Sequence, residues 1–157
     1  SAILPTRGRQ EFARQAVECF LSQEYPRKEL IILDDEDLPS FPHGVDFSWF
    51  HGLQEWDVIY RRHKGRSIAE KRNKCCELAH GEIICHFDSD DWSDPRRIQH
   101  QVDVMQESGK PVVGYHSMYF YSEDGRAFWY RGIVPIGAQG MFDQPPIQTL
   151  HATIELS

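Results

Sequence analysis

The most informative segment of the chain is Glu82-Ile83-Ile84-Cys85-His86-Phe87-Asp88-Ser89-Asp90-Asp91-Trp92. Apolar side chains dominate its first part, and three carboxylates follow within four residues. This pattern predicts a buried strand whose acidic end emerges at the carboxyl edge of an open α/β sheet, where such sheets bind ligands. Like charges this close repel one another, and a divalent cation with oxygen ligands is the simplest group that lets them coexist. We therefore expect a cation here, placed to hold a diphosphate.

A second strand ends in acids earlier in the chain. The continuous apolar run 30–33 predicts a strand buried on both faces, and Asp34-Asp35 follows it directly. Before it come a short strand at 2–4, ending in Pro5-Thr6-Arg7, and a helix at 10–23 with one apolar face. This order predicts a right-handed βαβ unit. Because parallel strands end at one edge of a sheet, both groups of acids should lie close together there.

The rest of the chain is read in the same way. Ser67 and Glu70 predict a capped helix start, Gly81 the residue just beyond that helix, and Asp124-Gly125 a hairpin turn. Further expected elements are strands at 58–60, 112–115, 117–121, 127–131 and weakly 149–156, and helices at 67–79 and from Pro95 to Gly109. Residues 36–56 are rich in aromatic side chains, which favours a small cluster under a loop over an insertion that lines a pocket.

Composition narrows the function. The 157 residues suit one domain with a real core, and no run of 18 apolar residues predicts a transmembrane segment. A net charge of -7 argues against nucleic acid as a partner. The basic residues at 61–66 and 71–72 suit a phosphate-bearing small molecule or a solvated surface. We expect no signal peptide and four reduced, mostly buried cysteines, hence a cytoplasmic protein.

Several of these features together resemble a known family. The segments are Pro5-Thr6-Arg7-Gly8-Arg9, Leu21-Ser22-Gln23-Glu24-Tyr25-Pro26, Glu29-Leu30-Ile31-Ile32-Leu33-Asp34-Asp35, Lys71-Arg72-Asn73, Ala79-His80-Gly81-Glu82-Ile83 and Phe87-Asp88-Ser89-Asp90-Asp91. In order and spacing they resemble the GT-A glycosyltransferases of family 2, over roughly Ile3 to Arg97. The resemblance implies one α/β GT-A domain over 1–157, a sandwich with a mostly parallel central sheet flanked by helices. Residues 1–97 would bind a nucleotide-sugar, and 98–157 would form a shortened acceptor-side half.

The resemblance also implies a site. Its nucleotide-sugar-binding residues would be Pro5, Thr6, Arg7, Asp34, Asp35, Lys71, Arg72, Asp88 and Ser89. One of the two acids after the second strand would recognise the base, usually uracil, whereas Lys71 departs from the small residue common in the family. Asp88 and Asp90 would form the Asp-x-Asp motif that holds Mn²⁺ or Mg²⁺. Such a metal acts as a Lewis acid on the departing nucleoside diphosphate.

The implied reaction is inverting transfer of a sugar, from a UDP-linked donor to a carbohydrate, lipid or protein acceptor. A family member would supply a general base downstream, often as Glu-Asp at the start of a helix, and this chain has no such pair. Glu123-Asp124 fits a solvated turn better. The candidate base is Asp143, which follows Gly140-Met141-Phe142 in a segment that resembles the family's Gly-x-Phe-Asp segment. His116 or His151 could add a metal ligand, although a lone histidine is usually structural. A non-catalytic nucleotide-sugar-binding domain without a base is therefore an alternative.

Two other acid-tipped folds fit less well. A phosphoryl-accepting receiver domain would carry its acid pair after the first strand and a lysine after a late strand, but no lysine follows Lys110. A haloacid-dehalogenase-like phosphatase would carry Asp-x-Asp-x-Thr on its first strand. Here Trp92 stands where that threonine would be, and the motif lies in the middle of the chain.

Overall fold

The computed structural model of the chain describes residues 1–46, 58–64, 67–122, 124–131 and 150–152. Three helices and seven strands lie within these residues. In chain order they are β1 (Ala2–Pro5), α1 (Gln10–Leu21), β2 (Leu30–Asp35), β3 (Val58–His63), α2 (Ile68–Leu78), β4 (Cys85–His86), α3 (Arg97–Ser108), β5 (Ser117–Tyr121), β6 (Ala127–Arg131) and β7 (Leu150–Ala152).

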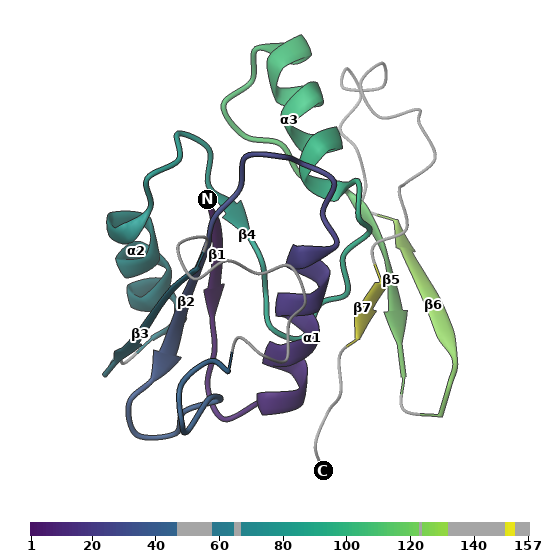
Figure 1. The fold of residues 1–157 in the computed structure, drawn as a ribbon. Coiled ribbons are helices and arrows are strands. Elements are labelled where there is room, and N and C mark those ends of the chain that lie inside the picture. The colour runs from purple at the N-terminus through teal and green to yellow at the C-terminus, as the bar shows by residue number, and fades with distance from the viewer. Residues whose placement is uncertain (47–57, 65–66, 123, 132–149, 153–157) are drawn as a thin grey trace.

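The central sheet has four parallel strands in the order β3-β2-β1-β4 (Figure 1). Ile3 of β1 lies opposite Ile31 of β2, which in turn lies opposite Ile59 of β3. The predicted mostly parallel sheet is confirmed, and β1 and β2 end side by side. The acids that end β2 and those that follow β4 therefore reach the same edge of the sheet.

Helices cover both faces of this sheet, and the alternation of side chains along each strand shows how. Leu4 of β1 and Ile32 of β2 pack in one cluster with residues of α1 and α3, including Val17 and Val102. The intervening residues Ile3, Ile31 and Leu33 pack on the other face with Cys75 of α2. Burial on both faces explains why β2 has an uninterrupted apolar sequence.

The strand that ends in the acid cluster is shorter than predicted. β4 is confined to two residues, which pair with Ala2 and Ile3 of β1. Ile83 and Ile84 precede the strand and are only half-buried, although Phe87 just beyond it is buried. Within the described residues β4 lies at the edge of its sheet, so a single neighbouring strand sets its length.

Two predicted positions at helix termini were also wrong, and α1 ends at Leu21 rather than at Gln23. α2 ends at Leu78, and Gly81 does not adopt the left-handed conformation that a glycine takes just beyond a helix. A Cβ atom on Gly81 would instead lie 2.8 Å from Ser1 Oγ, so the glycine permits a close chain contact. α3 begins at Arg97 rather than at Pro95, which lies in the preceding turn. The predicted end at Gly109 is confirmed, with a φ of 63°.

The second half of the chain forms a smaller sheet in the order β6-β5-β7 (Figure 1). β5 and β6 pair antiparallel across a turn in which Gly125 has a φ of 78°, so the predicted hairpin is confirmed. β7 runs parallel to β5. The strand expected at 112–115 was wrong: this segment is not in a strand, and Val112 is 82% exposed.

The remaining expectations have mixed outcomes. All four cysteines are free; Cys19 and Cys75 are buried, whereas Cys76 is exposed. Phe41, from the aromatic segment, is buried in the main core, while residues 47–57 lie outside the described part. Among the described residues, none of the helices has the length and apolar character needed to cross a membrane.

Candidate functional site

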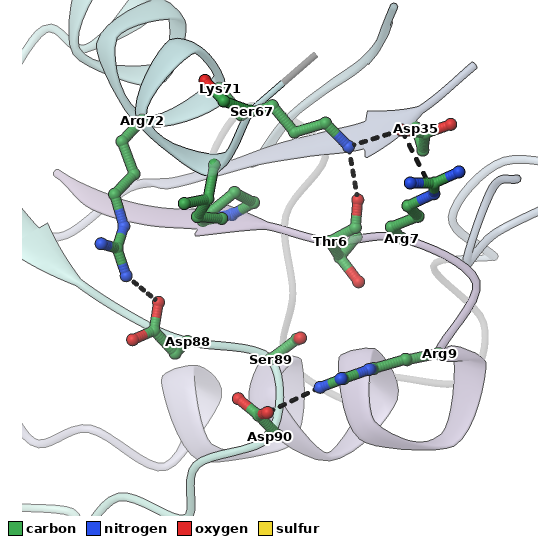
Figure 2. Close-up of a pocket in the computed structure, with 12 residues that line it drawn as sticks. Thr6, Arg7, Arg9, Asp35, Ser67, Lys71, Arg72, Asp88, Ser89 and Asp90 are labelled. Carbon is green, nitrogen blue, oxygen red and sulfur yellow. Dashed lines mark hydrogen bonds and ion pairs between the residues drawn. The ribbon is translucent and has the colours of Figure 1, made fainter. Parts of the chain in front are cut away.

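A cavity of about 430 Å³ opens at the carboxyl ends of β1, β2 and β4 (Figure 2). Pro5 and Asp35 end β1 and β2, and Asp88 follows β4 closely, while α2 supplies the remaining wall from its first turns. The lining residues are Pro5, Thr6, Arg7, Arg9, Asp35, Ser67, Ile68, Lys71, Arg72, Asp88, Ser89 and Asp90. Four cationic side chains thus face three carboxylates across one space.

A buried ion pair forms the inner end of this cavity. The Lys71 ammonium lies 2.9 Å from Asp35 Oδ2 and donates to the carbonyl oxygen of Thr6 at 3.1 Å. Lys71 and Asp35 are each only 5% exposed. The hydrogen bond from Lys71 holds the pKa of Asp35 below its ordinary value, against burial, which raises it; the backbone N–H of Leu38 adds to the lowering. Asp35 is therefore ionised at neutral pH.

The hydrogen bonds of Asp35 leave it little capacity for a ligand. Its two oxygens have about four lone-pair sites. Backbone N–H groups of Asp37 and Leu38 occupy Oδ1, and Lys71 occupies one site on Oδ2. Arg7 Nε stands 3.8 Å from Oδ2. One acceptor site beside Arg7 is thus what Asp35 can offer to a hydrogen-bond donor in the cavity.

Two arginines reach the outer carboxylates from opposite sides (Figure 2). Arg72 of α2 donates to Asp88 Oδ1 at 2.8 Å, and Arg9, just before α1, donates to Asp90 Oδ2 at 2.6 Å. All four side chains are partly exposed, from 35% for Arg72 to 49% for Arg9. Arg72 Nε is buried without a hydrogen-bond partner, which leaves one donor of this guanidinium unused.

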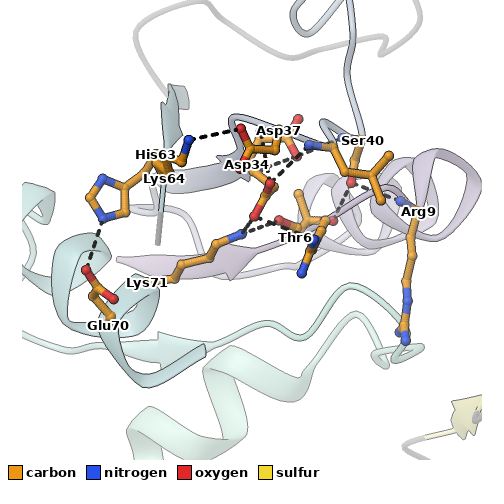
Figure 3. Close-up of polar contacts among 12 residues, drawn as sticks. Thr6, Arg9, Asp34, Asp37, Ser40, His63, Lys64, Glu70 and Lys71 are labelled. Carbon is orange, nitrogen blue, oxygen red and sulfur yellow. Dashed lines mark hydrogen bonds and ion pairs between the residues drawn. The ribbon is translucent and has the colours of Figure 1, made fainter. Parts of the chain in front are cut away.

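Asp34 has a different role from its neighbour. It is fully buried and accepts hydrogen bonds from the backbone N–H groups of Ser40 and Phe41, at 2.7 and 2.9 Å, and from Tyr60 Oη at 3.0 Å. These bonds fix the loop that follows β2 (Figure 3). Asp34 does not line the cavity. Successive residues of a strand point to opposite faces, so only one of these adjacent acids can face a ligand there.

The cavity brings together most of the residues that the sequence predicted. Those that line it are Pro5, Thr6, Arg7, Asp35, Lys71, Arg72, Asp88, Ser89 and Asp90. His116 does not line it, and neither does the basic segment 61–64. Asp143 and the side chain of His151 lie outside the described residues. The prediction did not include Arg9, Ser67 or Ile68 in the site; a second basic residue in the turn after the first strand was the available signal for Arg9.

The outer carboxylates fit a divalent cation of the magnesium type. Mg²⁺ is commonly held by one or two carboxylates together with substrate phosphates and water. Asp88 and Asp90 supply such oxygens at the cavity rim, with Ser89 between them. Within the described ranges, no group of three or more His, Cys, Asp or Glu side chains is placed to hold a metal ion. Asp88 and Asp90 would therefore share such a cation with phosphate and water.

A parallel sheet whose acid-tipped strands border a cationic cavity is the arrangement expected of a GT-A type α/β domain. The family described as Glycosyl transferase family 2 matches residues 1–154, and the chain belongs to that family. Among solved structures, TarS of S. aureus, residues 1-349 in complex with UDP-GlcNAc, superposes with a TM-score of 0.52. The two sequences are 18% identical, and the match covers 77% of this chain and 33% of the TarS chain. The likeness to TarS is one of fold.

Two curated relatives come from Bacillus subtilis (strain 168), and both carry provisional glycosyltransferase names. EpsE is 29% identical over 111 residues, which is 71% of this chain and 40% of EpsE. TuaG, named for teichuronic acid biosynthesis, is 27% identical over 114 residues, 68% of this chain and 42% of TuaG. The match thus spans about two fifths of the length of either relative.

Proposed function

We propose that this chain binds a nucleoside-diphosphate-sugar, UDP-linked, in the cavity at the carboxyl ends of β1, β2 and β4. Mn²⁺ or Mg²⁺ would be held by Asp88 and Asp90, and the sugar would pass with inversion to a carbohydrate, lipid or protein acceptor. The observation that carries this proposal is the lining of the cavity, in which four positively charged side chains and three carboxylates surround one space. Membership of family 2 and the complex of TarS with UDP-GlcNAc support it.

Each group in the cavity has a task that its chemistry suits. Guanidinium groups bind phosphate oxygens through paired N–H donors, so Arg72 would contact the diphosphate. Asp35, kept ionised by Lys71, would accept an N–H of the base at its remaining lone-pair site. When bound, the metal would supply Lewis-acid stabilisation of the leaving diphosphate. Asp143 is our candidate for the general base that takes the proton from the acceptor hydroxyl.

Binding of UDP tests the site directly. We expect UDP affinity, measured by isothermal titration calorimetry, to rise when Mn²⁺ is added, and Asp90→Ala to abolish that rise. Asp91→Ala is the matched control, because Asp91 is the adjacent carboxylate and does not line the cavity. If Asp90→Ala kept Mn²⁺-dependent UDP binding, the proposed metal site would be wrong.

Turnover separates an enzyme from a non-catalytic binding domain. Both would bind UDP with Mn²⁺, but only an enzyme would move sugar from a UDP-sugar to an acceptor, which mass spectrometry of the products detects. Asp143→Asn should remove transfer and leave UDP affinity unchanged. UDP binding without transfer to any carbohydrate, lipid or protein acceptor would favour the binding domain. Slow hydrolysis of the donor alone would not count as transfer.

A further inference from the structure

Arg9 occupies one of the two carboxylates assigned to the cation. Its guanidinium donates to Asp90 Oδ2 at 2.6 Å, a short contact for a charge-assisted hydrogen bond. An oxygen that already accepts from a guanidinium is a poorer ligand for a cation, which also repels the positive charge of Arg9. A cation that binds both oxygens of Asp90 therefore has to displace the Arg9 side chain from Oδ2.

The backbone of Arg9 is fixed, so a displaced side chain stays at the cavity. Its N–H donates to Ser40 Oγ at 3.1 Å, and Ser40 Oγ lies 2.7 Å from Thr6 Oγ1 (Figure 3). Gly8 holds the preceding turn with a φ of 59°. The Arg9 side chain itself is 49% exposed, which leaves it room to change partner. Phosphate oxygens in the cavity would give it a new anionic partner.

We propose that Arg9 is a diphosphate-binding residue that leaves Asp90 for the phosphates when a cation binds Asp90. This inference rests on the proposed function and gives a role to Arg9, which the predicted set of site residues did not include. One consequence is cooperative binding. Because the diphosphate gives Arg9 a new partner, bound diphosphate should raise the affinity of Asp90 for the cation. By reciprocity, the bound cation should raise the affinity for the diphosphate by the same factor. Arg72 on Asp88 is the corresponding pair on the other side of the cavity.

The proposal predicts opposite effects on two ligands from one substitution. In Arg9→Gln, we expect Mn²⁺ alone to bind about two- to fivefold more tightly, because a competing exposed ion pair is gone. UDP in the presence of Mn²⁺ should bind about tenfold more weakly or worse, because a charge-assisted hydrogen bond from Arg9 to the phosphates is lost. Electron paramagnetic resonance measures the concentration of free Mn²⁺ and hence the Mn²⁺ affinity, and isothermal titration calorimetry measures the UDP affinity. The gain in Mn²⁺ affinity that UDP produces should shrink in the variant.

Two controls separate partner exchange from a general effect of charge. Arg7→Gln removes the same charge from the same cavity, but Arg7 lies beside Asp35 rather than Asp90. Arg14→Gln breaks an exposed pair with Glu18 on α1, away from the cavity. We expect neither control to tighten Mn²⁺ binding as Arg9→Gln does. Far-ultraviolet circular dichroism and the melting temperature confirm that each variant is folded.

The outcomes distinguish this inference from the proposed function. If wild-type protein binds neither UDP nor Mn²⁺ with UDP, the proposed function is wrong and this inference falls with it. If the wild type binds both, but Arg9→Gln leaves Mn²⁺ affinity unchanged or lowers it, only the exchange is overturned. The same holds if Arg7→Gln tightens Mn²⁺ binding to the same extent. Tighter Mn²⁺ with weaker UDP in Arg9→Gln alone supports it.

Discussion

Lys71 supports the cavity from inside the protein. Its ammonium is buried against Asp35, and removing one partner of a buried ion pair leaves the other charge uncompensated. We expect Lys71→Met to lower the free energy of unfolding by about 3 kcal/mol, measured by urea denaturation at neutral pH. Lys74→Met, in the exposed pair with Glu77 on the same helix, should cost no more than about 0.5 kcal/mol. Equal losses in both variants would contradict this role of Lys71.

Asp35 gives the same pair a pH dependence with a definite sign. Lys71 lowers the pKa of Asp35 in the folded protein, so folding favours the ionised carboxylate. This contribution is complete above the ordinary pKa, near about 3.9, and is lost as the pH falls through the lower folded value. We expect stability to fall between about pH 5 and about pH 2, and less steeply in Asp35→Asn. Urea titrations across this range measure both slopes, and parallel curves would contradict the assignment.

At the scale of elements, the turn between β1 and α1 sets the position of the cavity arginines. Gly8 has a φ of 59°, and a Cβ atom there would lie 2.7 Å from two carbons of the Leu38 side chain. We expect Gly8→Ala to cost about 2 kcal/mol or more, from left-handed strain and this overlap, and to weaken UDP binding because Arg7 and Arg9 shift. Thermal unfolding and calorimetry measure the two effects.

Gly44 provides a matched control for that turn. It also has a positive φ, 86°, but a Cβ atom there would meet nothing within 4 Å. Gly44→Ala should therefore cost about 1 kcal/mol, from backbone strain alone, and leave UDP affinity unchanged. Leu38→Ala combined with Gly8→Ala should recover part of the lost stability. A cost for Gly44→Ala as large as that for Gly8→Ala would argue against the contact with Leu38.

The same elements explain which predictions the sequence supported. The apolar run of β2 predicted its strand well, because burial on both faces leaves a continuous signal. The runs at 83–84 and 112–115 look alike in sequence, but pairing partners decide strands, and β4 has only β1 beside it among the described residues. Arg9 was missed as a site residue because its partner Asp90 lies 81 residues away. A contact of that range depends on the fold.

Over the whole molecule, the described lining of the cavity comes from residues 5–90, and β5 and β6 take no part in it. We expect UDP with Mn²⁺ to slow hydrogen exchange in the turn after β1, in the first turns of α2 and around Asp88 to Asp90. Exchange in the β5–β6 hairpin should not change, because it contributes no group to the nucleotide site. Hydrogen–deuterium exchange with mass spectrometry resolves these segments. Protection of the hairpin as strong as that of the turn after β1 would show that the nucleotide site extends into the second half, against the division at residue 97.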